Sequence, residues 1–157
     1  MKTHGSFIVL AVLCCTGNAV SIRPDGSPGP QECPSDALKA MEYARIHIGD
    51  SGIIEIDANQ SHQSPISLND GPVESVLWSE DLGWFPIGTR LYGQIWTGGP
   101  SVVIRYYAAR PPDSGPIPIC GVARLGKGQM KKLPGSKPGN AILEFSGAAV
   151  YIVDEFR

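Results

Sequence analysis

From about residue 50 onward, apolar and polar residues alternate in short runs that turn residues separate. The clearest alternation runs from Thr89 to Thr97 and from Ser101 to Arg110, with a further run from Ile117 to Leu125. Successive side chains on a strand point to opposite faces, so a period of two predicts strands that each bury one face. We therefore expect a meander of antiparallel strands in the centre of the chain.

Shorter runs of the same kind flank this meander, at residues 53–57, 65–68, 73–78, 141–145 and 148–156. Turn signals such as Asn69-Asp70-Gly71-Pro72 and Gly98-Gly99-Pro100 lie between the runs. About seven short antiparallel strands at this spacing predict a mainly β domain, built as a small sandwich or a small barrel.

One segment near the start has helical rather than strand periodicity. Residues 37–46 read ALKAMEYARI, in which strong helix formers surround an apolar face. Ser35 and Asp36 before it offer capping side chains, and Gly49 and Gly52 after it end the helix. We expect this to be the one real helix of the domain, covering an edge or an open end of the sheet.

Composition supports the strand-rich interpretation, because 19 Gly and 14 Pro together make up 33 of the 157 residues. Residues 20–32 are rich in Pro, Gly and Ser, so we expect a flexible linker there and a single domain over 33–157. The formal net charge of -2 argues against a nucleic-acid-binding protein that works by broad phosphate neutralisation. We therefore expect no nucleic-acid partner.

The first 19 residues have the features of an export signal. Residues 7–13 form an apolar run, too short for a bilayer core of about twenty residues but suited to a signal peptide. Gly17 and Ala19 supply the small residues of ordinary cleavage, giving a signal at 1–19. A second interpretation makes Cys15 the lipidated first residue of a lipoprotein, so that the lipid anchor would be the only membrane contact. Both predict export, to the periplasm, the outer membrane or the medium.

Export decides how the remaining cysteines are interpreted. The folded domain keeps Cys33 and Cys120, and an even pair in an oxidising compartment predicts a disulfide. The alternative is a pair of buried free thiols. His47 and His62 lack metal-ligand spacing to either cysteine, so we assign no metal and no cofactor.

Alternation in the central meander gives a candidate binding surface opposite the core face. We call it the aromatic–arginine face, and its residues are Arg90, Tyr92, Trp96, Arg105 and Tyr107. Aromatic rings stack on sugars, and guanidinium groups bind carboxylates or phosphates through paired hydrogen bonds. This face predicts binding to an envelope protein or to a cell-wall or polysaccharide ligand. The alternative is an amphipathic sheet surface whose aromatic residues serve strand formation. The same alternation assigns Ala108 to the core and Ala109 to the outer face.

The sequence offers no specific combination of nucleophile, base and orienting residue. Gly49-Asp50-Ser51-Gly52 matches the string around the nucleophile of chymotrypsin-like proteases, but His47 lacks the context of a catalytic base. His62 follows Asp57 in a polar loop, where a solvated histidine is the simpler interpretation. We therefore assign no catalytic residues and expect a binding or assembly module. The alternatives are a small envelope hydrolase acting on glycan or peptide, and an accessory component of a secretion apparatus.

Several short segments resemble a family of small exported, uncharacterised β-domain proteins of gliding soil bacteria. These segments are Glu32-Cys33-Pro34, Ala40-Met41, Ile48-Gly49, Pro86 to Gly93 and Pro118-Ile119-Cys120. The two cysteines recur in that family, and the resemblance implies no known activity. Some members carry an automatic serine/threonine kinase label, but this chain has no kinase glycine loop, catalytic Asp loop or DFG.

A second resemblance covers Trp84 to Ile119. Pro86-x-Gly88-Thr89-x-Leu91-x-Gly93, followed by Pro112-Asp113, is similar to part of the β-barrel domain of the channel protein of type IV secretion and conjugation machines. There the segment forms barrel strands, so the resemblance implies strand pairing here rather than a binding site. The chain departs from that family at Ser114, where Gly is common, and it lacks the inserted helical hairpin.

Overall fold

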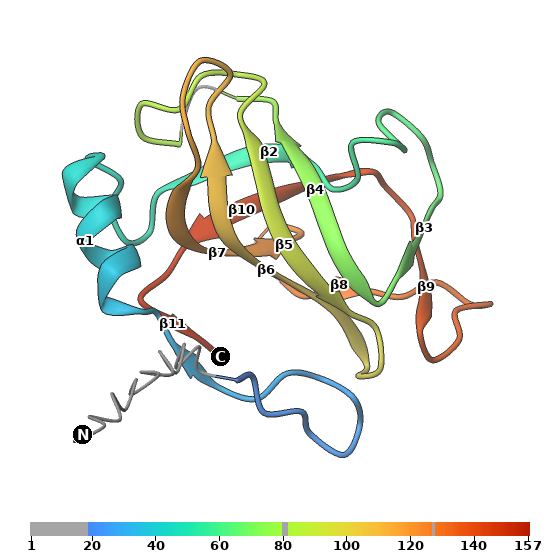
Figure 1. Cartoon of the computed structure of the whole chain (residues 1–157). Helices are drawn as coiled ribbons and strands as arrows, with labels where there is room; N and C mark the ends of the chain where they lie inside the picture. Colours follow the sequence, from blue (N-terminus) through green and yellow to red (C-terminus); the bar gives the residue numbers. More distant parts are fainter. Residues whose placement is uncertain (1–18, 80–81, 127) are drawn as a thin grey trace, which may run out of the picture.

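The computed structural model describes residues 19–79, 82–126 and 128–157. The predicted signal, apart from Ala19, and the predicted lipidation site Cys15 lie outside these residues. The described chain is mainly β with one helix, which confirms the predicted fold class. The main sheet closes into a barrel rather than forming a sandwich (Figure 1).

Six antiparallel strands form the barrel, in the order β5-β4-β2-β10-β7-β6, and β6 pairs back to β5. Their bounds are Ser51–Glu55 for β2, Gly71–Leu77 for β4, Arg90–Trp96 for β5, Ser101–Arg110 for β6, Ile117–Arg124 for β7 and Gly147–Ile152 for β10. A short extra strand, β8 (Met130–Lys131), pairs with the start of β6. Closure gives every barrel strand two neighbours, so the ring has no free edge.

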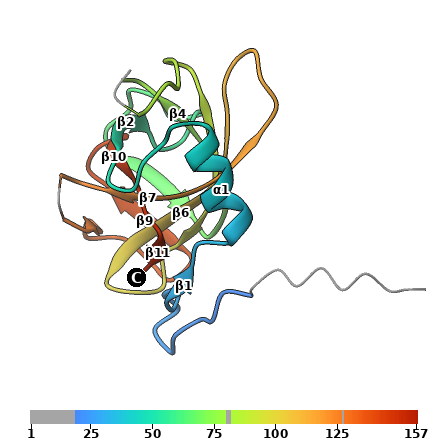
Figure 2. The ribbon, with the colours of Figure 1, turned by 90° about the vertical axis from the view of Figure 1, so that its left-hand side faces the viewer.

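Two small sheets stand beside the barrel. In one, β3 (Ile66–Asn69) pairs with β9 (Asn140–Leu143). In the other, β1 (Gln31–Glu32) pairs with β11 (Glu155–Phe156) and so joins the two ends of the domain. Figure 2 shows β1 and the end of the chain side by side below the barrel.

The barrel interior is filled by apolar side chains from alternate strand positions, which removes them from water. Fully buried examples are Ile54, Leu77, Leu91, Ile104 and Val150. Tyr106 is also buried there, and its hydroxyl lies 2.7 Å from Ser75 Oγ. Ser75 Oγ donates to the carbonyl oxygen of Ile56, so the Tyr106 hydroxyl is the donor to Ser75. This polar pair is therefore satisfied inside an apolar core.

A β-bulge in β6 interrupts the predicted alternation. Tyr92 pairs with Ala108 and Gly93 pairs with Tyr106, so Tyr107 is an extra residue with no partner on β5. The bulge reverses the faces beyond it: Ala109 is fully buried, whereas Ala108 is partly exposed. The sequence-based assignment of Ala108 to the core and Ala109 to the outer face was therefore wrong, because strict alternation does not survive an inserted residue.

The helix α1 spans Ser35–Tyr43 and packs its buried face, with Ala37 and Met41, against β7 (Figure 1). It ends before the predicted glycines because Arg45 adopts a φ of 53° and Ile46 N–H bonds back to Met41 O. α1 has only nine residues, and the described ranges hold no helix that is long and apolar enough to cross a membrane.

The predicted disulfide is present. Cys33, just before α1, is bonded to Cys120 in β7, with the two Cα atoms 5.9 Å apart. The Cys120 N–H also donates to the sulfur of Met41 at 3.4 Å. The bridge therefore fastens the start of the helix to the strand that the helix covers.

The structure departs from the prediction of a flexible linker at 20–32. Residues 27–29 are buried against the barrel, and Gln31–Glu32 form β1. Gly26 has a φ of 83° and lies against Gly98, where an added Cβ would stand 3.1 Å from the Gly98 Cα. The segment from residue 27 to β1 is therefore packed as part of the domain.

Candidate functional site

The structure splits the aromatic–arginine face into two parts. Trp96, Arg105 and Tyr107 lie together beneath the N-terminal segment and the end of the chain. Arg90 and Tyr92 lie at the start of β5, where they line a separate open hollow together with Arg110. The five residues therefore do not form one continuous free surface.

The covered part is built around Arg105, which is only 1% exposed. Its guanidinium carbon lies 5.5 Å from the Trp96 ring centroid and 5.1 Å from that of Phe156. Its Nη2 donates to the carbonyl oxygen of Gly29 at 2.7 Å. The side chain is thus held between two rings and the N-terminal segment, where no large ligand reaches it.

Tyr107 completes the covered part. Its ring packs on Phe156 with the centroids 5.4 Å apart, and its hydroxyl donates to Gln31 Oε1 at 3.3 Å. Burial raises the pKa of Tyr107, an effect that the charge of Arg105 partly offsets. The hydroxyl and the ring of Tyr107 are therefore occupied by contacts with the N-terminal segment and with the end of the chain.

Burial also lowers the pKa of Arg105, because the charged form is desolvated; the nearby Tyr107 oxygen opposes this shift, and repulsion from Arg23 and Arg124 adds to it. The Nε and Nη1 atoms of Arg105 are buried and have no hydrogen-bond partner among the described residues. A buried guanidinium normally has a carboxylate partner, since burying an unpaired charge costs free energy. Arg105 is therefore an under-satisfied cation.

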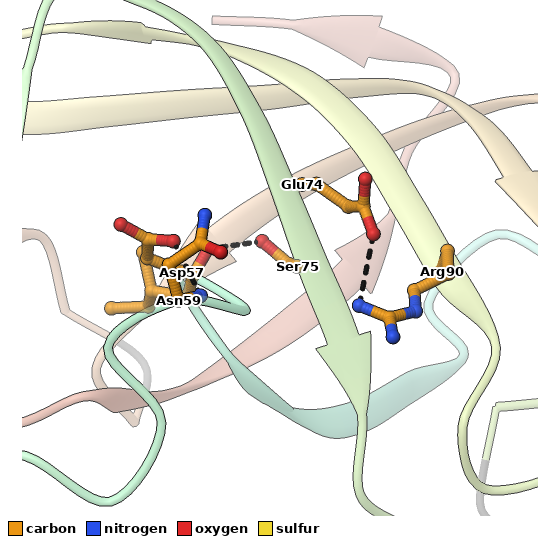
Figure 3. A network of polar contacts seen from close by, with 6 residues as sticks. Asp57, Asn59, Glu74, Ser75 and Arg90 are labelled. Carbon is orange, nitrogen blue, oxygen red and sulfur yellow. Dashed lines mark hydrogen bonds and ion pairs between the residues drawn. The ribbon is translucent and has the colours of Figure 1, made fainter.

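The open part of the face contains an ion pair between neighbouring strands. Arg90 Nη1 lies 2.9 Å from Glu74 Oε1, and both side chains are 44% exposed (Figure 3). Tyr92, Arg110 and Pro112 help to line a shallow hollow of about 400 Å³ around this pair. An exposed pair of this kind contributes little to stability. Arg90 is already paired with Glu74, so Arg110 is the cation of this hollow that no described ion pair engages.

A larger hollow is one that the sequence patterns did not predict. It is a groove of about 880 Å³ between the end of α1, the loop before β5, and the start of β7. We call it the helix groove; its lining residues are Ala40, Tyr43, Ala44, Arg45, Trp84, Pro116, Ile117 and Pro118. Its walls are thus mainly apolar.

Local chain geometry positions the two aromatic residues of the helix groove. Tyr43 is the last residue of α1 and is 94% exposed. Trp84 is 50% exposed and contacts the buried Phe85, with the two rings 5.3 Å apart. Gly83 lies against Ile46 just beyond the helix, where its φ of 58° suits glycine. Phe85 and Gly83 therefore anchor the loop while Trp84 stays at the surface.

Sequence reasoning missed this groove because its members come from segments without alternation. Trp84 stands in a loop, between Gly83 and Phe85, and Tyr43 belongs to the polar side of the helix. An unexplained large aromatic residue in a Gly- and Pro-containing loop was the available signal. Only the packing of α1 beside β7 brings these residues together.

The histidines make contacts that differ from those considered in the sequence. His62 Nδ1 lies 3.4 Å from Glu55 Oε1, whereas Asp57 accepts from the backbone N–H of Asn59. His47 Nδ1 lies 3.6 Å from Asp50 Oδ2 at the surface. Within the described residues, no group of three or more Cys, His, Asp and Glu could hold a metal ion. Neither histidine lines the helix groove.

The chain matches no protein-family model and no curated protein sequence. The surfaces of the molecule are therefore the basis for the functional conclusion. Among them, the helix groove is larger than the hollow around Arg90 and is lined by exposed aromatic side chains.

Proposed function

We propose that this protein is an exported binding module that holds an apolar, acid-containing segment of another envelope protein in the helix groove. The observation that carries this proposal is the exposure of Trp84 and Tyr43 on the walls of an otherwise apolar groove. Large aromatic side chains left in water are characteristic of binding sites, where they contribute much of the affinity.

The chemistry of the groove walls favours a polypeptide over a glycan. Glycan sites combine an aromatic platform with side chains that hydrogen-bond the sugar hydroxyls. The described lining residues include no Asp, Glu, Asn or Gln, and the two prolines, Pro116 and Pro118, add apolar surface. Burial of apolar side chains from a partner is therefore the main interaction that this surface offers.

Arg45 indicates where an acidic group of the partner would bind. It is the one charged residue among the described lining residues, it is exposed, and no described side chain pairs with it. A guanidinium binds a carboxylate through two parallel hydrogen bonds. A Glu, an Asp or a chain-terminal carboxylate next to the apolar residues of the partner complements this arrangement.

We also propose that the protein is exported and that its role is not catalytic. The signal-like N-terminus and the Cys33–Cys120 disulfide support a location in an oxidising compartment. The described lining residues of the helix groove include no Ser, Cys, His or carboxylate that would act as a nucleophile or base. An accessory role in a secretion apparatus is one form that such protein binding would take.

The test is affinity capture from an envelope extract with Trp84→Ala and Arg45→Glu variants, followed by identification of the captured protein. Phe145→Ala is the matched control, because Phe145 is 53% exposed and does not line the helix groove. We expect both groove variants to lose the partner that the wild type and the control retain. Equal capture by all four proteins would contradict the proposal, as would Trp84-dependent capture of polysaccharide alone. Circular dichroism checks that each variant is folded.

A further inference from the structure

A third, smaller hollow lies where the N-terminal turn meets the end of β7 and the end of the chain. We call it the arginine pocket; its volume is about 170 Å³. Its charged and polar lining residues are Arg23, Asp25, Ser27, Ser101, Arg124, Gln129 and Arg157. The arginines come from three segments that are far apart in the sequence, so the pocket exists only in the folded protein.

The N-terminal turn is firmly built, which gives Arg23 a defined place. Arg23 N–H donates to Ser27 O at 2.8 Å, and Gly26 N–H donates to Arg23 O at 2.9 Å. Asp25 Oδ1 accepts from both the backbone N–H and the hydroxyl of Ser27, at 2.9 and 2.6 Å. These two bonds lower the pKa of Asp25 and engage its carboxylate within the turn.

Acidic side chains are too few to neutralise the arginines around this pocket. Arg157 Nε is 2.9 Å from Glu155 Oε2, but Arg23 and Arg124 have no ion pair among the described residues. Among the described residues that line the pocket or pair with its arginines, the acidic side chains are Asp25 and Glu155, against the three arginines Arg23, Arg124 and Arg157.

The buried Arg105 adds a fourth cation next to the pocket. Val103, two residues earlier on the same outer face of β6, lines the pocket, and so does Pro28, the neighbour of the Gly29 carbonyl that Arg105 contacts. Two nitrogen atoms of Arg105, Nε and Nη1, are buried and have no hydrogen-bond partner in the part of the chain that the structure describes. An unpaired buried guanidinium beside unpaired surface arginines is an arrangement that an anion would stabilise.

We propose that the arginine pocket binds a phosphate group. A carboxylate presents two oxygens in one plane, whereas a phosphate presents oxygens in tetrahedral directions and can accept from guanidinium groups on several sides. Here the guanidinium groups come from the N-terminal turn, the end of β7 and the end of the chain. Gln129, whose Oε1 accepts from Ser101 Oγ at 3.0 Å, retains an amide nitrogen as a further donor.

The phosphate would come from solution or from a lipid headgroup, and the experiment separates these sources. Wild-type protein is titrated with inorganic phosphate against chloride at equal ionic strength, and is also mixed with vesicles of phosphatidylglycerol or of phosphatidylcholine. Arg23→Ala and Arg124→Ala are the test variants. Arg110→Ala is the matched control, because Arg110 is an exposed arginine that lines the separate hollow near Arg90.

We expect saturable phosphate binding that each test variant weakens about tenfold, as the loss of one charged hydrogen bond predicts, while the control binds like the wild type. Binding to phosphatidylglycerol vesicles that follows the same pattern would identify the lipid headgroup as the source. Absence of saturable binding to phosphate and to both vesicles would overturn the proposal. Equal weakening in Arg110→Ala would also overturn it, since net charge rather than the pocket would then govern binding. Binding at this pocket does not depend on the helix groove.

Discussion

The guanidinium of Arg105 donates to the carbonyl oxygen of Gly29 at 2.7 Å, across 76 residues of sequence. This bond joins the middle strand of the meander to a segment that composition alone marked as a linker. The rings of Trp96 and Phe156 enclose the same side chain. The face predicted to bind a ligand is thus partly used to bind the protein's own N-terminal segment.

Replacing Arg105 tests how much its charge contributes. In phosphate-free buffer, the free energy of unfolding of Arg105→Met should lie within about 1 kcal/mol of the wild-type value. The reason is that removal of a buried charge without a carboxylate partner offsets the loss of the hydrogen bond to Gly29. Arg105→Ala should lower the free energy of unfolding by about 2–4 kcal/mol, since it also leaves a cavity beside the two rings. Urea unfolding measures both. Equal losses in the two variants would show that the charge itself stabilises the fold.

At the bulge in β6, the backbone of Arg105 leaves no room for a side chain at Gly93. A Cβ at this position would overlap the carbonyl oxygen of Arg105, which is backbone and has no room to move within a closed barrel. We expect Gly93→Ala to lower the free energy of unfolding by about 3 kcal/mol. Gly115→Ala is the control, because nothing lies within 4 Å of its Cβ position, and its effect should stay within about 0.5 kcal/mol. Similar stability of the two variants in chemical denaturation would contradict the described bulge.

Tyr106 makes stability sensitive to alkaline pH. Burial raises the pKa of Tyr106 in the folded protein well above the ordinary value of 10.0. The contribution of the protonated phenol to the free energy of unfolding is therefore fully present below pH 10 and is lost as pH rises further. Above pH 10 the free energy of unfolding of the wild type should fall by about 1.4 kcal/mol per pH unit more than that of Tyr106→Phe. At neutral pH the variant should lose about 1 kcal/mol, the value of one hydrogen bond.

Urea unfolding from pH 8 to 11 measures this difference in slope. Tyr43→Phe is the control, because Tyr43 is 94% exposed and its replacement should leave the slope of the wild type unchanged. Parallel pH profiles for wild type and Tyr106→Phe would mean that the phenol is accessible to solvent in the folded state.

The Cys33–Cys120 disulfide should dominate the stability of the domain. It closes a loop of 87 residues, so replacing both cysteines by Ala should cost about 4–5 kcal/mol through the entropy of the unfolded chain. Peptide mapping of denatured, unreduced protein should recover the two cysteines in one linked pair, with the reduced protein as the control. Recovery of both as free thiols would contradict the bridge.

Local pattern was enough to predict the fold class. Alternation over Thr89–Thr97 and the first half of Ser101–Arg110 identified strands and their core face, because side-chain direction along a strand depends only on backbone geometry. The cysteine count predicted the disulfide, since only two cysteines follow the predicted signal. The helix was also predicted, with its end displaced because Arg45 leaves the helical conformation earlier than the glycines require.

The candidate sites depended on contacts between residues that are far apart in the sequence, and the local pattern of apolar and polar residues does not predict such contacts. The bulge at Tyr107 reversed the faces of Ala108 and Ala109, and the pairing of β1 with β11 covered Trp96 and Arg105. Trp84 and Tyr43 line one groove only because α1 packs beside β7.

The sequence by itself determined that the part of the chain described here forms short antiparallel strands with one helix and one disulfide, because those features follow from periodicity and from the chemistry of single residues. The tertiary structure alone decided which aromatic and arginine side chains remain exposed. Exposure depends on what the segment from Gly29 to Glu32 and the strand β11 cover, and these contacts join residues that are many tens of positions apart.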